Sequence, residues 1–78
     1  MKKYMVVEHF KDGCFDLVYE RFEQKGRILP EGLEYIDSWR SKDDMICFQL
    51  METNDPTLFG TWISSWEDLV DFEIFPLD

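Results

Sequence analysis

The stretch CFQLMETNDP, residues 47–56, decides the fold, because a strand ends and a helix begins within it. Its first half is apolar and predicts a strand. Asp55 suits the N-cap of a helix, and Pro56 suits the first helical position because its φ is already fixed. Behind them, an apolar helix face is predicted from Leu58, Phe59, Trp62, Ile63 and Trp66. The stretch is therefore one half of a split βαβ repeat.

The other half of the repeat lies nearer the N-terminus. Residues 4–10 are rich in β-branched and aromatic side chains and predict a strand. Asp12 is expected to cap the next helix by accepting backbone N–H bonds, and Gly26 is expected to end it in the left-handed conformation. Between these two residues, one apolar stripe at helical spacing consists of Phe15, Val18, Tyr19 and Phe22.

A β-hairpin is predicted between the two halves, with strands over residues 33–40 and 45–53. A last strand over residues 69–75 is stopped by Pro76. The order strand–helix–strand–strand–helix–strand predicts an α+β, ferredoxin-like βαββαβ sandwich. Right-handed crossovers place both helices on one face of its four-stranded antiparallel sheet. We expect residues 1–78 to form a single domain, because a chain of 78 residues is too short for two.

The opposite face of such a sheet has no helix to cover it. A bare, partly apolar sheet face in a soluble protein must be covered by something. Two such faces packed together give a dimeric α/β barrel, so we expect a homodimer. Aromatic residues make up 17% of the chain, which favours a pocket or an interface, with an aromatic-rich core as the simpler alternative.

The charge balance argues against two classes of partner. Eight basic and 17 acidic residues give a net charge of −9, which opposes binding to nucleic acid or to an anionic membrane. No apolar run approaches the length of a membrane span. Cys14 and Cys47 are expected to be free thiols of a cytoplasmic protein. One histidine and no Cys-x-x-Cys pair predict no metal site, and we expect no cofactor.

The chain contains five distinctive blocks: KYMVVE (3–8), GRILPEGL (26–33), DSW (37–39), CFQLME (47–52) and WEDLVDFE (66–73). Trp62 lies between the last two blocks. In these blocks the chain resembles a small bacterial domain-of-unknown-function family, number 3303. The resemblance covers nearly the whole chain. It implies a ferredoxin-like fold of the dimeric α/β-barrel type, and it carries over no activity and no catalytic residue.

Glu8 is the first candidate for a chemical role. It lies in a hydrophobic strand, and burial would raise its pKa, as a general base requires. The favoured alternative is a strand-end carboxylate that reaches solvent or pairs with Arg27. His9 is adjacent on the strand and therefore points to the opposite face, where we expect a solvated side chain and not a metal ligand.

A second set of candidates depends on the register of the hairpin. Tyr35, Asp37 and Trp39 are expected to share one face of their strand, and Gln49 lies on the next strand. A three-residue turn over residues 42–44, which we prefer, puts them on one side as a pocket wall. A two-residue turn would put them on opposite sides. A mutual hydrogen bond between Asp37 and Gln49 is an equal alternative to a ligand site.

Two tryptophans and one arginine complete the predicted cleft. Trp62 and Trp66 are four residues apart and share a helix face, where we favour core packing over a pocket wall with free indole N–H groups. Arg27 can anchor an anion, although a structural tie to Glu31 or Glu8 is favoured. The predicted ligand-binding residues are Glu8, Arg27, Tyr35, Asp37, Trp39, Gln49, Trp62 and Trp66.

The sequence is compatible with three functions. The first is a homodimer that binds a small organic ligand in a cleft between helix and sheet. The second is a cofactor-independent enzyme, an isomerase or a monooxygenase-type protein, which rests on fold analogy alone. The third is a structural or interaction protein whose helix–sheet space is filled.

Overall fold

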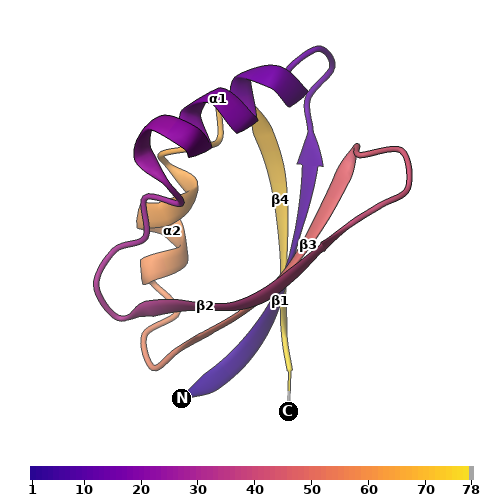
Figure 1. Cartoon of the computed structure of the whole chain (residues 1–78). Helices are drawn as coiled ribbons and strands as arrows, with labels where there is room; N and C mark the ends of the chain where they lie inside the picture. The colour runs from indigo at the N-terminus through magenta and orange to yellow at the C-terminus, as the bar shows by residue number, and fades with distance from the viewer. Residues whose placement is uncertain (78) are drawn as a thin grey trace.

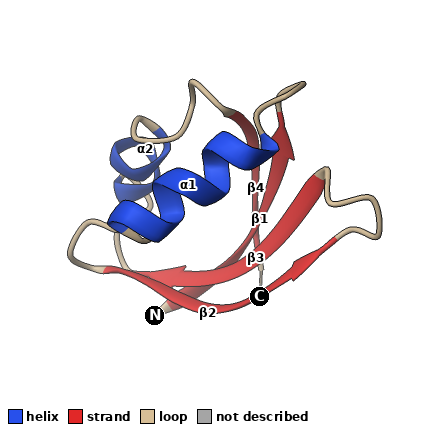
Figure 2. Cartoon of the chain, turned by 45° about the horizontal axis from the view of Figure 1, so that its top comes forward, coloured by secondary structure: helices blue, strands red, loops and turns tan. Residues whose placement is uncertain are grey.

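The computed structural model describes residues 1–77, and its elements follow the predicted order. They are β1 (Lys2–Phe10), α1 (Phe15–Lys25), β2 (Leu33–Arg40), β3 (Ile46–Thr53), α2 (Leu58–Ile63) and β4 (Val70–Pro76). The strands form one antiparallel sheet in the order β2-β3-β1-β4. Both helices lie on the same face of this sheet (Figures 1 and 2). The predicted ferredoxin-like βαββαβ fold is confirmed.

The core lies between the sheet and the helices. Alternate residues of β1 and β3 point toward the helices, as the two-residue period of a strand requires. The residues packed there include Tyr4, Val6, Leu33, Met51, Phe59, Trp62 and Trp66. No helix in the described part of the chain is both long and apolar enough to span a membrane.

The two helix starts differ from the sequence prediction. Cys14, and not Asp12, occupies the N-cap of α1, because Asp12 and Gly13 form a turn in which the Cys14 N–H bonds the Lys11 carbonyl at 2.9 Å. Helix α2 begins at Leu58, two residues later than predicted. Its entry is a tight turn in which Asp55 accepts the backbone N–H of Thr57 at 3.1 Å. Asp55 therefore stabilises the approach to the helix from outside its first turn.

Gly26 ends α1, as predicted, although not in the left-handed helical conformation. Its φ is 65° and its ψ is −153°, and its N–H bonds the Phe22 carbonyl at 2.7 Å. A residue with a side chain is strained at this φ, so glycine is the natural choice here. The chain leaves the helix in an extended direction and leads back to the edge of the sheet.

Strand β2 contains a bulge that the sequence analysis did not foresee. Tyr35 pairs with Met51, but Asp37 already pairs with Leu50, so Ile36 is an extra residue. An extra residue changes which face all later side chains occupy. The prediction that Tyr35, Asp37 and Trp39 share one face is therefore wrong.

The turn of the hairpin also differs from the prediction. The Ser41 N–H bonds the Ile46 carbonyl at 2.8 Å, so residues 42–45 form a four-residue connection in place of the predicted turn over residues 42–44. Tyr35 stays on the helix side of the sheet with Gln49. Asp37 and Trp39 face the other way, beside Leu50 and Phe48.

We use the term outer face for the side of the sheet opposite the helices. Three aromatic residues are strongly exposed on it: Trp39 is 50% exposed, Phe48 37% and Phe75 49%. Trp39 on β2 pairs with Phe48 on β3, and Phe75 on β4 pairs with Met5 on β1, so apolar side chains of all four strands contribute to this face. The outer face is thus apolar in its middle.

Candidate functional site

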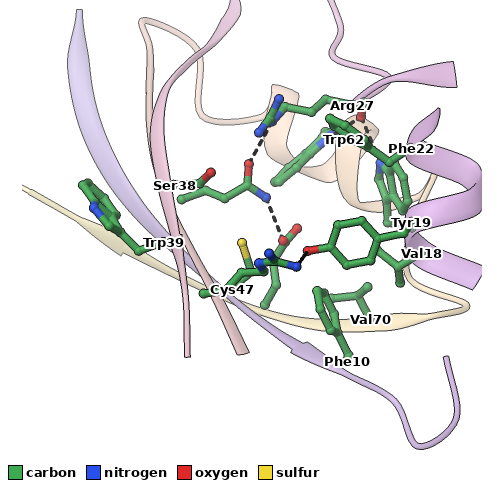
Figure 3. Close-up of a pocket in the computed structure, with 14 residues that line it drawn as sticks. Phe10, Val18, Tyr19, Phe22, Arg27, Ser38, Trp39, Cys47, Trp62 and Val70 are labelled. Carbon is green, nitrogen blue, oxygen red and sulfur yellow. Dashed lines mark hydrogen bonds between the residues drawn. The ribbon is translucent and has the colours of Figure 1, made fainter. Parts of the chain in front are cut away.

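A cavity of about 300 Å³ lies between α1 and the sheet, and we refer to it as the helix–sheet cavity (Figure 3). None of the 11 residues of α1 is buried, so the helix lies over the sheet without closing onto it. Arg21 fastens the far side of α1 through two hydrogen bonds of 2.8 Å to Asp68. The apolar walls of the cavity are Phe10, Val18, Tyr19, Phe22, Trp62, Trp66 and Val70.

The floor of the cavity is a polar row that runs across the sheet. Arg40 on β2 pairs with Cys47 on β3, and Cys47 pairs with Glu8 on β1. The next row places Ser38 opposite Gln49. Directly paired residues on one face have Cβ atoms about 4.5–5.5 Å apart, so these side chains are neighbours. Polar groups are therefore concentrated on the floor, and apolar groups on the walls.

Glu8 is the buried carboxyl group of this floor. It is only 8% exposed, and it accepts a 2.7 Å hydrogen bond from the Gln49 amide. Gln49 in turn accepts a 3.2 Å bond from Nε of Arg27, so the three side chains form one chain. Burial raises the pKa of Glu8 above its ordinary value, although bonds from Gln49 and Cys47 and the charge of Arg27 oppose the rise. The expectation of a solvated Glu8 is wrong, and its link to Arg27 runs through Gln49.

Cys47 is a buried thiol beside Glu8. Burial, followed by the nearby charge of Glu8, raises the pKa of Cys47 to about 12. The thiolate is the nucleophilic form of cysteine, and a thiol with this pKa stays protonated near neutral pH. Cys47 therefore acts in the cavity as a weak hydrogen-bond donor.

Arg27 contributes both its backbone and its side chain. Its carbonyl oxygen accepts both indole N–H groups, from Trp62 and from Trp66, at 2.9 Å each. Its guanidinium carbon lies 3.5 Å from the centre of the Tyr35 ring, which is a close cation–π contact. The indole N–H groups are thus occupied, so the less favoured alternative, in which they are free to hold a ligand, is wrong. The favoured prediction of core packing is confirmed, since Trp62 is 1% exposed and Trp66 5%.

Arg40 is the second cation of the cavity. Its Nη1 donates a 2.6 Å hydrogen bond to the Tyr19 hydroxyl, which joins the end of β2 to α1. On its outward side, Nε lies 3.8 Å from the Asp44 carboxylate. Arg40 faces the helices because of the bulge at Ile36 and the four-residue turn after it, neither of which the sequence analysis predicted.

A family model described as a domain of unknown function, DUF3303, matches residues 2–77. The chain belongs to the DUF3303 family. No curated protein matches it. Among solved structures, an antibiotic biosynthesis monooxygenase superimposes on this DUF3303 chain with a TM-score of 0.61 and 18% sequence identity. The likeness covers 100% of this chain and 97% of that one, and at this identity it establishes a shared fold alone.

The DUF3303 chain brings together five of the eight predicted site residues: Glu8, Arg27, Gln49, Trp62 and Trp66. Tyr35 lies beneath the Arg27 guanidinium, next to the cavity. Trp39 borders the cavity, but its indole points away from it (Figure 3). Asp37 lies on the outer face and accepts the backbone N–H of Ser38. The hydrogen bond between Asp37 and Gln49 that was considered as an alternative is therefore absent.

His9 lies on the outer face of the sheet, opposite in direction to Glu8, as predicted. Its Nε2 lies 2.6 Å from a carboxylate oxygen of Glu73 on β4. Within residues 1–77 no group of three or more His, Cys, Asp or Glu side chains gathers in a way that would hold a metal ion. The contact of His9 is an exposed polar pair between neighbouring strands.

Sequence reasoning missed several residues of the cavity. The helical stripe that includes Val18, Tyr19 and Phe22 was recognised, and its direction toward the sheet could have marked these residues as a wall. Arg40 and Ser38 depend on the bulge and could not be assigned. The complete set of missed residues is Phe10, Val18, Tyr19, Phe22, Ser38, Arg40, Cys47 and Val70.

Proposed function

We propose that this DUF3303 protein is a homodimer that binds a small organic ligand in the helix–sheet cavity. One observation supports the ligand above all: a preformed apolar cavity of about 300 Å³ with a few convergent polar groups on its floor. Ligand sites in proteins combine apolar walls with a small number of placed polar groups in this way.

The polar floor favours a ligand site over a purely structural role. A buried carboxyl group costs free energy unless it is hydrogen-bonded, and apolar residues would fill the same space at lower cost. Glu8 and Gln49 are both buried, at 8% and 6% exposure. A protein whose helix–sheet space served only as a core would have a closed space there, with no need for this chain of polar groups.

The dimer is supported by the outer face. Its exposed aromatic residues, Trp39, Phe48 and Phe75, form an apolar area flanked by charged residues of the same strands. A second copy of the chain presents a matching area, and packing the two together covers both. We expect the contact to bury more than about 1,000 Å², the usual size of a specific interface. Light scattering at micromolar concentration should give twice the mass of the chain, and a monomer mass would contradict the proposal.

Two further parts of the proposal concern the chain as a whole. We propose that residues 1–78 act as one domain and that the protein works in the cytoplasm. The support for the second point is that both Cys14 and Cys47 are free thiols, which is the usual state of cysteine in a reducing compartment.

A cavity-filling variant tests the ligand proposal. Val18 lies on the cavity wall, so Val18→Trp should fill the cavity and abolish the rise in melting temperature that bound ligands cause. Leu17→Trp is the matched control, because Leu17 is 50% exposed on the other side of α1. A library of small carboxylates, phenols and amides supplies the ligands. Equal stabilisation of the wild type and Val18→Trp would contradict a site in the cavity.

A second candidate function is a cofactor-independent enzyme, an isomerase or a monooxygenase-type protein. The observation that favours it is Glu8, a carboxyl group on the cavity floor whose pKa is raised by burial. A raised pKa suits a general base. If Glu8 accepts a proton in a reaction, Glu8→Gln should abolish turnover of a bound substrate while the protein still binds it. If the wild type binds the compounds but does not convert any of them, the ligand-binding function stands and the catalytic function is excluded.

A further inference from the structure

The charge of the helix–sheet cavity is opposite to that of the chain. The whole sequence has a net charge of −9 and 17 acidic residues. Among the acidic residues within positions 1–77, only Glu8 lines the cavity, whereas two of the three arginines, Arg27 and Arg40, line it. The cavity is thus the place where an acidic protein concentrates its guanidinium groups.

Neither arginine is neutralised by a buried carboxylate. Among residues 1–77, no carboxylate forms an ion pair with Arg27, whose Nε bonds the neutral amide of Gln49. Arg40 has an ion-pair partner, Asp44, at 3.8 Å, but both side chains are about half exposed, at 48% and 51%, and Asp44 lies on the turn of the hairpin. Exposed ion pairs contribute little because water screens them. The two guanidinium groups therefore retain capacity for an anionic ligand.

The walls determine which anion fits. Apart from Trp39, whose indole points away, five aromatic side chains line the cavity: Phe10, Tyr19, Phe22, Trp62 and Trp66. Small inorganic anions would leave these rings without contact, whereas a flat ring would pack against them. A carboxylate on that ring matches the planar fork of a guanidinium group. An aromatic acid would satisfy both the walls and the cations.

We propose that the helix–sheet cavity binds an aromatic monoanion, with its charged group against Arg27 and Arg40, and that Glu8 is protonated in the complex. This inference rests on the proposed function, because it assigns a chemical class to the ligand of the same cavity.

The protonation of Glu8 follows from its neighbours. Cys47 and Gln49 on β3 and Arg27 in the loop before β2 contact or act on it directly, with Arg40 on β2 and Tyr19 on α1 facing the same cavity. Its partner on β4, Phe72, carries no charge. An ionised Glu8 would repel a ligand carboxylate, whereas a protonated Glu8 can donate a hydrogen bond to it. Burial already favours the neutral form. Binding should therefore take up a proton.

The first experiment compares three probes of one shape by isothermal titration calorimetry: naphthoate, the neutral naphthamide and the cationic naphthylmethylammonium. We expect naphthoate to bind the wild type at least tenfold more tightly than naphthamide near pH 6. Arg27→Gln and Arg40→Gln should each weaken naphthoate binding about tenfold or more, as the loss of a charge-assisted bond does, and leave naphthamide nearly unchanged. Arg27→Lys and Arg40→Lys, which keep the charge, should recover part of the affinity.

Lys25→Gln is the matched control, because it removes one positive charge from an exposed position on α1 outside the cavity. It should change naphthoate affinity less than about threefold, since exposed charges at a distance are screened. If Lys25→Gln weakens naphthoate binding as much as the arginine variants do, the effect comes from net charge alone, and the inference is overturned.

The second experiment measures the uptake of protons when naphthoate binds. Between about pH 5.5 and 8.5, where naphthoate itself stays ionised, wild-type affinity should fall as pH rises. Titrations in two buffers of different ionisation enthalpy should show proton uptake on binding. Glu8→Gln should remove both the uptake and the pH dependence. Affinity independent of pH in the wild type would overturn the role of Glu8.

The outcomes distinguish the two proposals. If naphthamide binds in the cavity as well as or better than naphthoate, the anion inference fails and the ligand-binding function stands. If none of the three probes binds and Val18→Trp does not alter the response to any compound of the library, the proposed function fails with it.

Discussion

Trp62 and Trp66 share one hydrogen-bond acceptor, because both indole nitrogens donate to the backbone carbonyl of Arg27 at 2.9 Å. The two rings thus tie α2 and the turn after it to the loop between α1 and β2. That loop carries the Arg27 side chain into the helix–sheet cavity. Since the bonds use the backbone of Arg27, the anchor is independent of the side chain that we propose for binding.

The shared acceptor predicts a coupling between the two tryptophans. In Trp62→Phe or Trp66→Phe, the carbonyl of Arg27 keeps one donor, whereas the double variant leaves it with none. We expect the double variant to lose about 1 kcal/mol more free energy of unfolding than the two single losses together. Urea unfolding of the four proteins measures this. Strictly additive losses would show that the carbonyl finds another donor, such as water.

Glu8 predicts a specific pH dependence of stability. Its pKa is raised in the folded state, so the folded protein holds the proton at pH values where the unfolded chain has lost it. The wild type should therefore lose stability as pH rises from about 4.5 through the folded pKa of Glu8. Glu8→Gln removes this loss, so its advantage over the wild type should grow across the same pH window.

The control for this prediction is Glu23→Gln, which removes an identical charge from an exposed position on α1. Urea midpoints of both variants and the wild type, measured at several pH values, show whether the pH dependence is specific to Glu8. A Glu8→Gln advantage that is constant from acid to neutral pH would mean that Glu8 titrates alike in the folded and unfolded chains.

Phe48 tests the outer face. It is 37% exposed beside Trp39 in the middle of this surface. In the proposed dimer, Phe48→Glu places a charge in the interface, and the dimer should weaken about 30-fold or more, as for a central interface residue. Leu17→Glu, at an exposed position on α1, should leave the dimer intact. Sedimentation equilibrium of both variants supplies the constants, and an unaffected dimer would place the interface elsewhere.

The two cysteines should differ in reactivity. With a pKa of about 12, Cys47 has a thiolate fraction of only about 10⁻⁴ at pH 8, and it is also buried. Iodoacetamide should therefore modify Cys14 in the folded protein and Cys47 only after unfolding. Mass spectrometry of peptides from timed reactions shows the order. Early modification of Cys47 would contradict its burial beside Glu8.

Two glycines with positive φ give a matched pair of substitutions. Gly13 has a φ of 75° and open space around it, whereas a Cβ at Gly32, with a φ of 94°, would lie 3.1 Å from Leu58 Cδ1. Alanine at either position should cost about 1–2 kcal/mol for the backbone conformation. Gly32→Ala should cost more, because Leu58 must also move. Urea midpoints test this, and equal losses of stability would show that the Leu58 side chain moves aside at no measurable cost.

The fold was predictable from local patterns, and the site only in part. Strand and helix positions followed from β-branched runs, the Phe15 to Phe22 stripe and the glycine at position 26, because each signal is local in sequence. The facing of Asp37 and Trp39 was not predictable, because a bulge depends on how two strands pair. Glu8, Arg27 and Gln49 were selected correctly as cavity residues, since their positions precede or avoid the bulge.

The bulge at Ile36 and the four-residue turn over residues 42–45 together decide the sign of the charge in the cavity. With the regular pairing of the sequence prediction, Asp37 and Trp39 would have faced the helices, and Ser38 and Arg40 would have faced outward. The cavity would then have held one guanidinium and two carboxylates in place of two guanidiniums and one carboxylate. A change in the length of β2 near this point would therefore exchange the preference for anions that we propose for a preference for cations, without any substitution in the cavity itself.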